Sequence, residues 1–195
     1  MERKKMMHLL KEAETCLGSY DEFPTMPVGT DPMPCLSRNR VAQPFFLVSE
    51  HDQVLLSLSG KSRIELPGAS PDATEMEVGD AVYVPAGQPS RVVPVTETVQ
   101  LRFKAEPAGW EAALWLCAQC GAEVFRQELD ASAAPAQEGY WKACQDFNAD
   151  ASRRRCRGCG ALHPSADLND IRWNDVAAGL RVEDASRQTR SAALG

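Results

Sequence analysis

Short apolar runs separated by turn residues dominate the middle of the chain. Ser59-Gly60, Pro67-Gly68 and Gly79-Asp80 are turn signals that separate several of these runs. Most runs begin roughly 8–12 residues after the previous one, a spacing typical of all-β folds. The runs are 45–48, 54–58, 63–66, 81–84, 91–93 and 99–103. The pattern predicts an antiparallel barrel or sandwich over residues 45–106.

The residues before this β unit predict a helix and an extended arm. Apolar residues recur at helical spacing between Met6 and Leu17, which predicts one amphipathic helix docked on a core. Five prolines follow between Gly18 and Pro44, too many for a regular helix or a central strand. Residues 1–44 are therefore expected to form a helix and a proline-rich arm.

The residues after the β unit divide into two segments. Residues 107–165 carry two cysteine pairs and little strand pattern, so we expect a separate metal-binding segment there. Residues 166–195 are predicted to form a polar tail with one helix around Trp173–Val182 and a disordered last dozen residues.

Composition and charge narrow the class of protein. The 195 residues suit one medium domain, and 21 Lys+Arg against 27 Asp+Glu give a net charge of −6, which disfavours a nucleic-acid binder. No stretch approaches the ~20 apolar residues that cross a bilayer, so we expect no membrane contact. The first residues lack the apolar run of a secretory signal, and we expect a cytoplasmic protein.

The cysteines predict a metal site. Cys117 and Cys120 form one C-x-x-C-G knuckle, and Cys156 and Cys159 form a second. Each knuckle aims two thiolates at one point, and the glycine that follows allows the tight turn. Together they predict one tetrahedral site for a single Fe or Zn ion. A structural role is favoured over electron transfer, because the segment is too poor in apolar residues to fold alone. The closed site also leaves no open position for a substrate. Cys144 remains either a substitute ligand or a buried thiol.

Two motifs in the β unit resemble those of cupins. Residues 79–90 fit the second cupin motif, G-x5-P-x-G-x2-H, except that Ser90 replaces the histidine. Gln53 precedes Gly60 by seven positions, where the first motif has E-x6-G. With the two knuckles added, residues 38–165 resemble bacterial 3-hydroxyanthranilate 3,4-dioxygenase, a cupin followed by a rubredoxin-like site. The resemblance implies a mainly β cupin barrel with a small C-terminal knuckle, and a homodimer.

The departures from that family concern its chemistry. The family opens an aromatic ring with O2 on an iron(II) held by two histidines and a glutamate. Its glutamate falls on Gln53 and one histidine on Ser90, and no histidine lies between Pro44 and Ser49. An amide and a hydroxyl are poor iron ligands, so we expect no catalytic iron in the barrel. The family's substrate-contacting glutamate falls near Phe103.

A polar pocket could remain where the iron is lost. Strand alternation would place His51 and Gln53 on one face, and Ser90 would join them. Arg40 matches one arginine of the family's pocket. The alternatives are that His51 belongs to a solvated strand end and that Arg153–Arg155, a cluster able to bind an anion, is a solvated loop.

Three functional hypotheses follow. The first is a divergent dioxygenase-like cupin that binds or transforms an aromatic or amino-acid-derived metabolite, with specialised metabolism as one setting. The second is a non-catalytic pseudoenzyme that regulates or scaffolds a protein partner, with the knuckle as its docking surface. The third is a ring-cleaving dioxygenase with unusual ligands such as His51.

Overall fold

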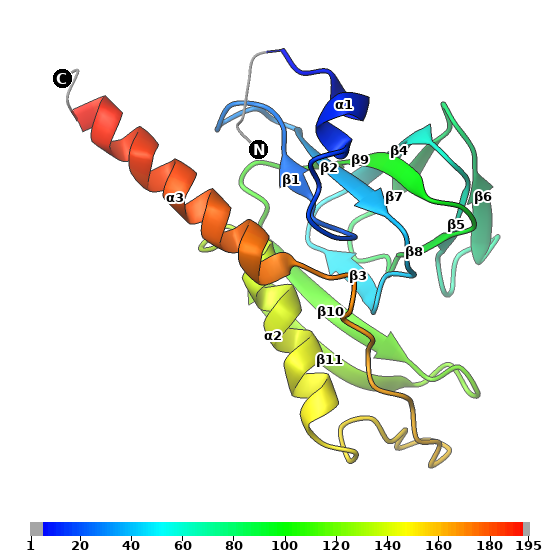
Figure 1. Ribbon diagram of the computed structural model, residues 1–195. Coiled ribbons are helices and arrows are strands. Elements are labelled where there is room, and N and C mark those ends of the chain that lie inside the picture. The colour runs from blue at the N-terminus through cyan, green and yellow to red at the C-terminus, as the bar shows by residue number, and fades with distance from the viewer. Residues whose placement is uncertain (1–5, 193–195) are drawn as a thin grey trace.

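Figure 1 shows the computed structural model, in which residues 6–192 are described. Three helices, α1 (Leu9–Ala13), α2 (Ala136–Ala149) and α3 (Trp173–Ala192), accompany eleven strands within this range. The strands are β1 (Phe23–Pro24), β2 (Met33–Asn39), β3 (Phe46–Ser49), β4 (Gln53–Ser59), β5 (Ser62–Glu65), β6 (Ala73–Met76), β7 (Ala81–Val84), β8 (Arg91–Pro94), β9 (Thr98–Lys104), β10 (Trp110–Leu116) and β11 (Glu123–Asp130).

The strands form three antiparallel sheets that wrap around a common interior. Their orders are β1-β2-β9-β4-β7, β11-β10-β3 and β6-β5-β8. A bridge between Leu47 and Ser90 links the second and third sheets next to β8. The predicted fold class, a mainly β barrel with a C-terminal four-cysteine knuckle, is confirmed by the strands and by the thiol cluster described below.

The expectation that the proline-rich arm excludes a central strand is wrong. β2 lies between β1 and β9 in the five-stranded sheet. Pro34 is tolerated because its carbonyl faces β1, where it accepts hydrogen bonds from the backbone N–H (2.9 Å) and hydroxyl of Thr25. The missing N–H of Pro34 points the same way, towards a strand only two residues long, so the ladder to β9 is intact.

The expectation of little strand pattern after residue 107 is also wrong. β10 and β11 form a long hairpin, and β3 pairs with the other edge of β10. α2 lies along this hairpin, and its buried residues recur at helical spacing: Gln137, Tyr140, Ala143, Cys144 and Phe147. Strands of the barrel therefore come from the predicted arm and metal-binding segment as well as from residues 45–106.

The two terminal helices differ in length from their predictions. α1 spans only Leu9–Ala13 of the helix expected over residues 6–17, because only Ala13 in it is buried. α3 continues far beyond Val182, so the part of the last dozen residues up to Ala192 is helical, and residues 193–195 lie outside the described range. Ile171 and Trp173 of the predicted polar tail are buried in the main core. No helix within residues 6–192 combines the length and apolar character needed to cross a membrane.

Gly60 provides a test of the turn between β4 and β5. Its φ is +74°, and a Cβ there would lie 2.0 Å from the backbone oxygen of Glu97. Gly68 has a similar φ of +83°, but a Cβ there would meet none of the described residues within 4 Å. We expect Gly68→Ala to cost about 1–2 kcal/mol of unfolding free energy, from backbone strain alone. Gly60→Ala should cost at least about 3 kcal/mol because β9 must also move.

Urea unfolding of the two variants measures this difference. Equal losses of unfolding free energy in both variants would contradict the close approach of Gly60 to the segment before β9.

Candidate functional site

The four knuckle cysteines meet at one end of the β10–β11 hairpin. Their sulfur atoms all lie within 4.8 Å of one another. Cys117 Sγ is 3.6 Å from Cys159 Sγ, and Cys120 Sγ is 3.6 Å from Cys156 Sγ. Metal–sulfur bonds of about 2.3 Å would place tetrahedral sulfurs about 3.8 Å apart, so these distances fit a single Zn or Fe ion.

The two knuckles have the same backbone hydrogen bonds. The N–H of Cys117 donates to Ala122 and that of Gly121 to Cys117, each at 2.8 Å. The equivalent bonds run from Cys156 to Ala161 at 2.8 Å and from Gly160 to Cys156 at 2.9 Å. Gly121 and Gly160 have φ values of +71° and +76°, which glycine adopts readily. The local sequence thus builds two matching halves of one site.

The environment of Cys156 favours its thiolate form. The backbone N–H of Cys159 lowers the pKa of Cys156 to about 7, against the opposing effect of burial. A metal binds thiolates, so this effect prepares the site for an ion. Cys117 and Cys156 are buried, whereas Cys120 and Cys159 are exposed, which leaves one side of the site at the surface.

Cys144 does not belong to the thiol cluster. It is completely buried in α2 among core residues, which matches the buried-thiol alternative. Burial raises the pKa of its thiol above its ordinary value. The site therefore has its four ligands from the knuckles alone.

A second set of chemically notable residues fills the barrel. The side chains of Glu22, Arg102, Lys104 and Glu111 are each at most 9% exposed, although all four carry charge. Arg102 and Lys104 alternate along β9 with Leu101 and Phe103, and the alternation turns both cations inward. Two cations and two anions make the cluster neutral overall.

Direct contacts join all four charges. Glu22 lies 2.7 Å from Arg102 Nε through one oxygen and 2.7 Å from Lys104 Nζ through the other. Lys104 also lies 2.9 Å from Glu111 and donates to the Tyr140 hydroxyl at 2.8 Å. The Tyr140 hydroxyl in turn donates to Glu111. We call these four charges, with Tyr140 and Gln53, the barrel ion cluster.

Neighbours within the barrel ion cluster favour the charged forms of Glu22 and Lys104. Burial alone would raise the pKa of Glu22, but Lys104 and Arg102 bring it below its ordinary value. Burial likewise opposes the charge on Lys104, yet Glu111 and Glu22 raise its pKa well above the ordinary value. Removal of any one charge would leave its partners uncompensated in a buried site.

The two positions where cupin motifs place metal ligands do not fit a divalent cation. Gln53 is buried, and its amide oxygen accepts a hydrogen bond from Arg102 Nη1 at 2.7 Å. A metal bound to that oxygen would lie beside a guanidinium and be repelled by it. Ser90 is buried next to Leu47, and its neutral hydroxyl has no hydrogen-bond partner among the described residues. Neither an amide nor a hydroxyl supplies the anionic or imidazole donor that Fe(II) needs.

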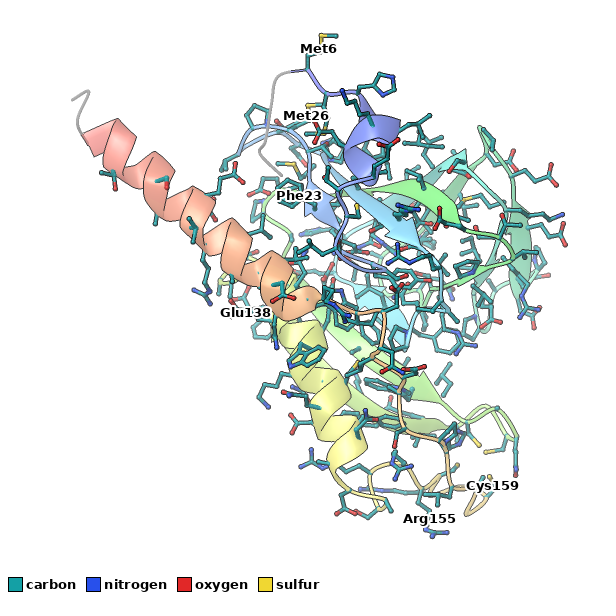
Figure 2. All side chains as sticks on the ribbon, viewed as in Figure 1. Met6, Phe23, Met26, Glu138, Arg155 and Cys159 are labelled. Carbon is teal, nitrogen blue, oxygen red and sulfur yellow. The ribbon has the colours of Figure 1, made fainter. Side chains whose placement is uncertain are left out.

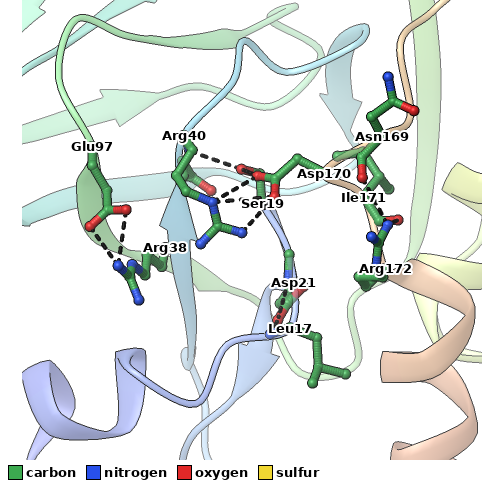
Figure 3. A network of polar contacts seen from close by, with 12 residues as sticks. Leu17, Ser19, Asp21, Arg38, Arg40, Glu97, Asn169, Asp170, Ile171 and Arg172 are labelled. Atoms are coloured by element: carbon green, nitrogen blue, oxygen red, sulfur yellow. Dashed lines mark hydrogen bonds and ion pairs between the residues drawn. The ribbon is translucent and has the colours of Figure 1, made fainter.

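The predicted pocket residues His51 and Arg40 lie outside the barrel. His51 is exposed in the bend before β4, so it does not share the interior face with Gln53 as the alternation predicted. Arg40 lies at the surface just after β2. Its guanidinium is 2.6 Å from Asp170, which also accepts a hydrogen bond from Ser19, as Figure 3 shows. This contact ties the N-terminal arm to the segment before α3.

A groove of about 760 Å³ opens beside the barrel ion cluster. Glu22 and Lys104 line it and are almost completely buried, so they form its floor. Small residues from Ala131 to Ala136 form one wall, and Leu180 and Arg181 of α3 form part of another. Neither Gln53, Ser90 nor Arg40 lines this groove.

Sequence reasoning missed the residues that form the barrel ion cluster. Gln100, Arg102 and Lys104 alternate with apolar residues, a signal that the polar residues share one face of β9. Alternation does not say which face is internal. Glu22 comes from the arm and Glu111 from β10, neither of which was predicted to contribute to the barrel.

Comparisons with known proteins find likeness in structure only. No family model and no curated protein matches the sequence. A cupin-2 domain protein of Shewanella frigidimarina is similar over 52% of this chain and 95% of its own, at 11% identity and a TM-score of 0.45. Hydroquinone 1,2-dioxygenase of Sphingomonas sp. TTNP3 is similar over 49% and 71%, at 12% identity and a TM-score of 0.42.

Salicylate 1,2-dioxygenase of Pseudoaminobacter salicylatoxidans is similar over 43% of this chain and 22% of its own, at 21% identity and a TM-score of 0.36. These identities and scores are too low to support an inference about activity. The chemistry of the chain must therefore be argued from its own residues.

Proposed function

We propose that this chain is a divergent cupin, related to 3-hydroxyanthranilate dioxygenases, that binds a small aromatic or amino-acid-derived metabolite without a catalytic iron. The observation that carries this proposal is the groove whose floor is the barrel ion cluster. Its volume, about 760 Å³, lies within the range typical of small-molecule sites. Any reaction in this groove would use acid–base catalysis and the positioning of the bound molecule, rather than iron-dependent opening of an aromatic ring.

The groove offers both polar and apolar recognition. Glu22 and Lys104 present opposite charges at the floor, while Val28 and Met33 add apolar surface. All three N–H bonds of Lys104 have partners within the barrel ion cluster, so the carboxylate of Glu22 retains more capacity for a ligand. A flat molecule with a hydrogen-bond donor at one end fits this arrangement.

The metal of the knuckle has a different role in this proposal. Its four ligands leave no open position for a substrate, so the ion stabilises the segment rather than reacting. The thiolate set accepts either Zn or Fe, and both would support the same structure.

Ligand binding tests the proposed site. We expect at least one member of a panel of aromatic amino acids, anthranilate and 3-hydroxyanthranilate to raise the melting temperature and to bind in calorimetry. Ala133→Trp would narrow the groove wall and should weaken binding at least about tenfold, since the added ring takes the ligand's space. Val78→Trp, at an exposed position that does not line the groove, is the matched control.

Three results would count against the proposal. Binding that is unchanged by Ala133→Trp would place the ligand elsewhere. If no panel member binds, the non-catalytic scaffold hypothesis is favoured. That hypothesis is also supported by the barrel ion cluster, whose opposite charges pair with one another at the centre of the barrel. Oxygen uptake with 3-hydroxyanthranilate and Fe(II), lost in His51→Ala, would instead establish a dioxygenase with unusual ligands.

A further inference from the structure

Helix α2 joins the four-cysteine knuckle to the proposed ligand groove. A rise of about 1.5 Å per residue makes this 14-residue helix about 20 Å long. Figure 2 shows Glu138 at one end of the helix, and Arg155 and Cys159 of the second knuckle beyond the other end. The first two residues of α2, Ala136 and Gln137, line the groove. The helix therefore has one end at each of the two sites.

The C-terminal end of α2 is held by the segments that carry the knuckles. The Phe147 ring stacks on the Trp115 ring, with centroids 4.3 Å apart and an angle of 12° between the planes. Trp115 precedes Cys117, the first cysteine of the knuckles, by two residues. Asn148 exchanges two hydrogen bonds, of 2.7 and 2.9 Å, with the backbone of Ala166, which follows the second knuckle. Both knuckles are thus attached to the last turn of this helix.

The N-terminal end of α2 holds the turn that presents Glu22 to the groove. The Gln137 side-chain amide donates to the backbone carbonyls of Asp21 and Glu22, at 2.8 and 3.2 Å. About one helical turn later, the Tyr140 hydroxyl accepts a hydrogen bond from Lys104 of the groove floor, at 2.8 Å. Gln137 and Tyr140 are both buried, so water does not replace these contacts. The groove floor is thus attached to the beginning of the same helix.

The turn that carries Glu22 has an unfavourable backbone conformation. Tyr20 and Glu22 have φ values of +58° and +44°, and no other non-glycine residue in the described range has a positive φ. Such conformations cost bulky residues free energy and persist only where neighbouring groups hold them. The Gln137 amide and the Trp173 indole N–H, which donates to the Tyr20 carbonyl at 2.7 Å, supply that support. The position of Glu22 in the groove floor therefore depends on α2 and α3.

We propose that metal binding at the knuckle and the order of the groove floor support each other through α2, an inference that rests on the groove being the ligand site proposed above. The two knuckles come from distant parts of the chain and are joined through the ion that their four thiolates share. Without that ion, the last turn of α2 loses its support, and helices of this length are marginal on their own. Gln137 then holds the strained turn at Glu22 less firmly, and a ligand loses part of its site.

Hydrogen exchange with and without the metal tests this coupling in the ligand-free chain. The backbone N–H groups of Tyr20 and Glu22 each donate to a side chain of β2, at 2.8 and 3.0 Å, and report on the strained turn. In chain stripped of metal by a chelator, we expect their protection from exchange to fall at least about fivefold. Residues 62–65 of β5, in the separate sheet β6-β5-β8, should keep their protection. Unchanged protection of Tyr20 and Glu22, or an equal fall in both segments, would overturn the proposal.

A second experiment weakens the groove end of α2 and measures the knuckle. Gln137→Ala should let a chromogenic chelator remove Zn²⁺ from the loaded chain at least about fivefold faster than from the wild type. Gln88→Ala is the matched control, because the Gln88 amide also donates to two backbone carbonyls but does not line the groove. Release from Gln137→Ala at the wild-type rate, or equally fast release from Gln88→Ala, would contradict the coupling.

A ligand experiment separates this inference from the proposed function. Any panel member that binds in the groove should bind at least about fivefold more weakly to the stripped chain, and should raise the affinity of the chain for Zn²⁺ by the same factor, because such coupling is reciprocal. Unchanged affinities would overturn the coupling and leave the proposed function intact. If no panel member binds but Gln137→Ala still releases Zn²⁺ faster, the proposed function fails and the coupling stands.

Discussion

Lys104→Met should lower the free energy of unfolding by about 3–5 kcal/mol. Lys104 is the centre of the barrel ion cluster, with Glu22, Glu111 and Tyr140 all within 2.9 Å of its ammonium group. Methionine has a similar length but no charge, so Glu111 would remain buried without a cationic partner. Urea unfolding followed by tryptophan fluorescence measures the loss, since Trp115 and Trp173 are buried in the core.

Two further variants separate the buried charge from other effects. Lys61→Met removes a surface lysine that pairs with Glu75 and Glu77, and should change the free energy of unfolding far less, because solvent screens exposed ion pairs. Lys104→Met combined with Glu111→Gln leaves only the neutral pair of Glu22 and Arg102, and should recover part of the loss. A cost for Lys104→Met no larger than that of Lys61→Met would show that the cluster is not buried as described.

The barrel ion cluster also predicts how the free energy of unfolding changes with pH. Folding lowers the pKa of Glu22, so its ionised carboxylate adds to the free energy of unfolding at pH values above its unfolded pKa of about 4.5. This contribution is lost as the pH falls through the lower pKa of the folded state. Folding raises the pKa of Lys104, so its ammonium group adds to the free energy of unfolding at pH values below its unfolded pKa of about 10.5. This contribution is lost as the pH rises through the higher pKa of the folded state. The unfolding free energy of the wild type should therefore fall more at both extremes than that of the Lys104→Met variant.

Cys156→Ser should remove the bound metal and unfold the knuckle. Cys156 is 1% exposed and supplies one of four ligands, and a neutral hydroxyl cannot replace a thiolate. Structural zinc sites supply about 10–16 kcal/mol in isolated zinc-finger peptides. Since the segment between the knuckles includes α2, which packs in the core, we expect a loss of about 5 kcal/mol or more in the whole chain.

Cys144→Ser is the matched control for this experiment. Cys144 is also completely buried, but it lies outside the thiol cluster. Its serine variant should keep the metal and lose stability only from burial of a hydroxyl, about 1–3 kcal/mol. Proteolysis of both variants with and without a chelator reports on the knuckle directly. Equal resistance of Cys156→Ser and the wild type to protease would contradict a stabilising metal.

The metal site could be predicted from the sequence because its signal is local. Each knuckle is fixed by a few consecutive residues, in which the glycine turn and the cysteine spacing determine where both sulfurs point. To predict that the two knuckles come together, only one further assumption is needed, namely that all four thiolates bind the same ion. The structure brings the four thiols together as this assumption requires, with all sulfurs within 4.8 Å.

The barrel interior could not be predicted in the same way. Alternation in β9 shows that Arg102 and Lys104 share a face, and the usual expectation is that such a face meets solvent. Here the apolar face, with Leu101 and Phe103, packs near α1, and the charged face is internal. Only the arrival of Glu22 and Glu111 from distant parts of the chain makes this stable.

The errors in the arm and around His51 have the same physical origin. Proline is excluded from a central strand only where its missing N–H faces a partner, and Pro34 faces the short β1 instead. His51 precedes the first residue of β4, so the alternation that fixes Gln53 inside does not reach it. In both cases the outcome depends on where a strand begins or ends, which is β1 beside Pro34 and β4 after His51.

The metal content of the purified chain tests the central claim most directly. The claim is that the four-cysteine knuckle holds one ion and that the barrel, with Arg102 beside Gln53, holds none. Elemental analysis should find one Zn or Fe per wild-type chain, and less than a tenth of that in Cys156→Ser. Two ions per wild-type chain, or one that survives Cys156→Ser, would contradict it.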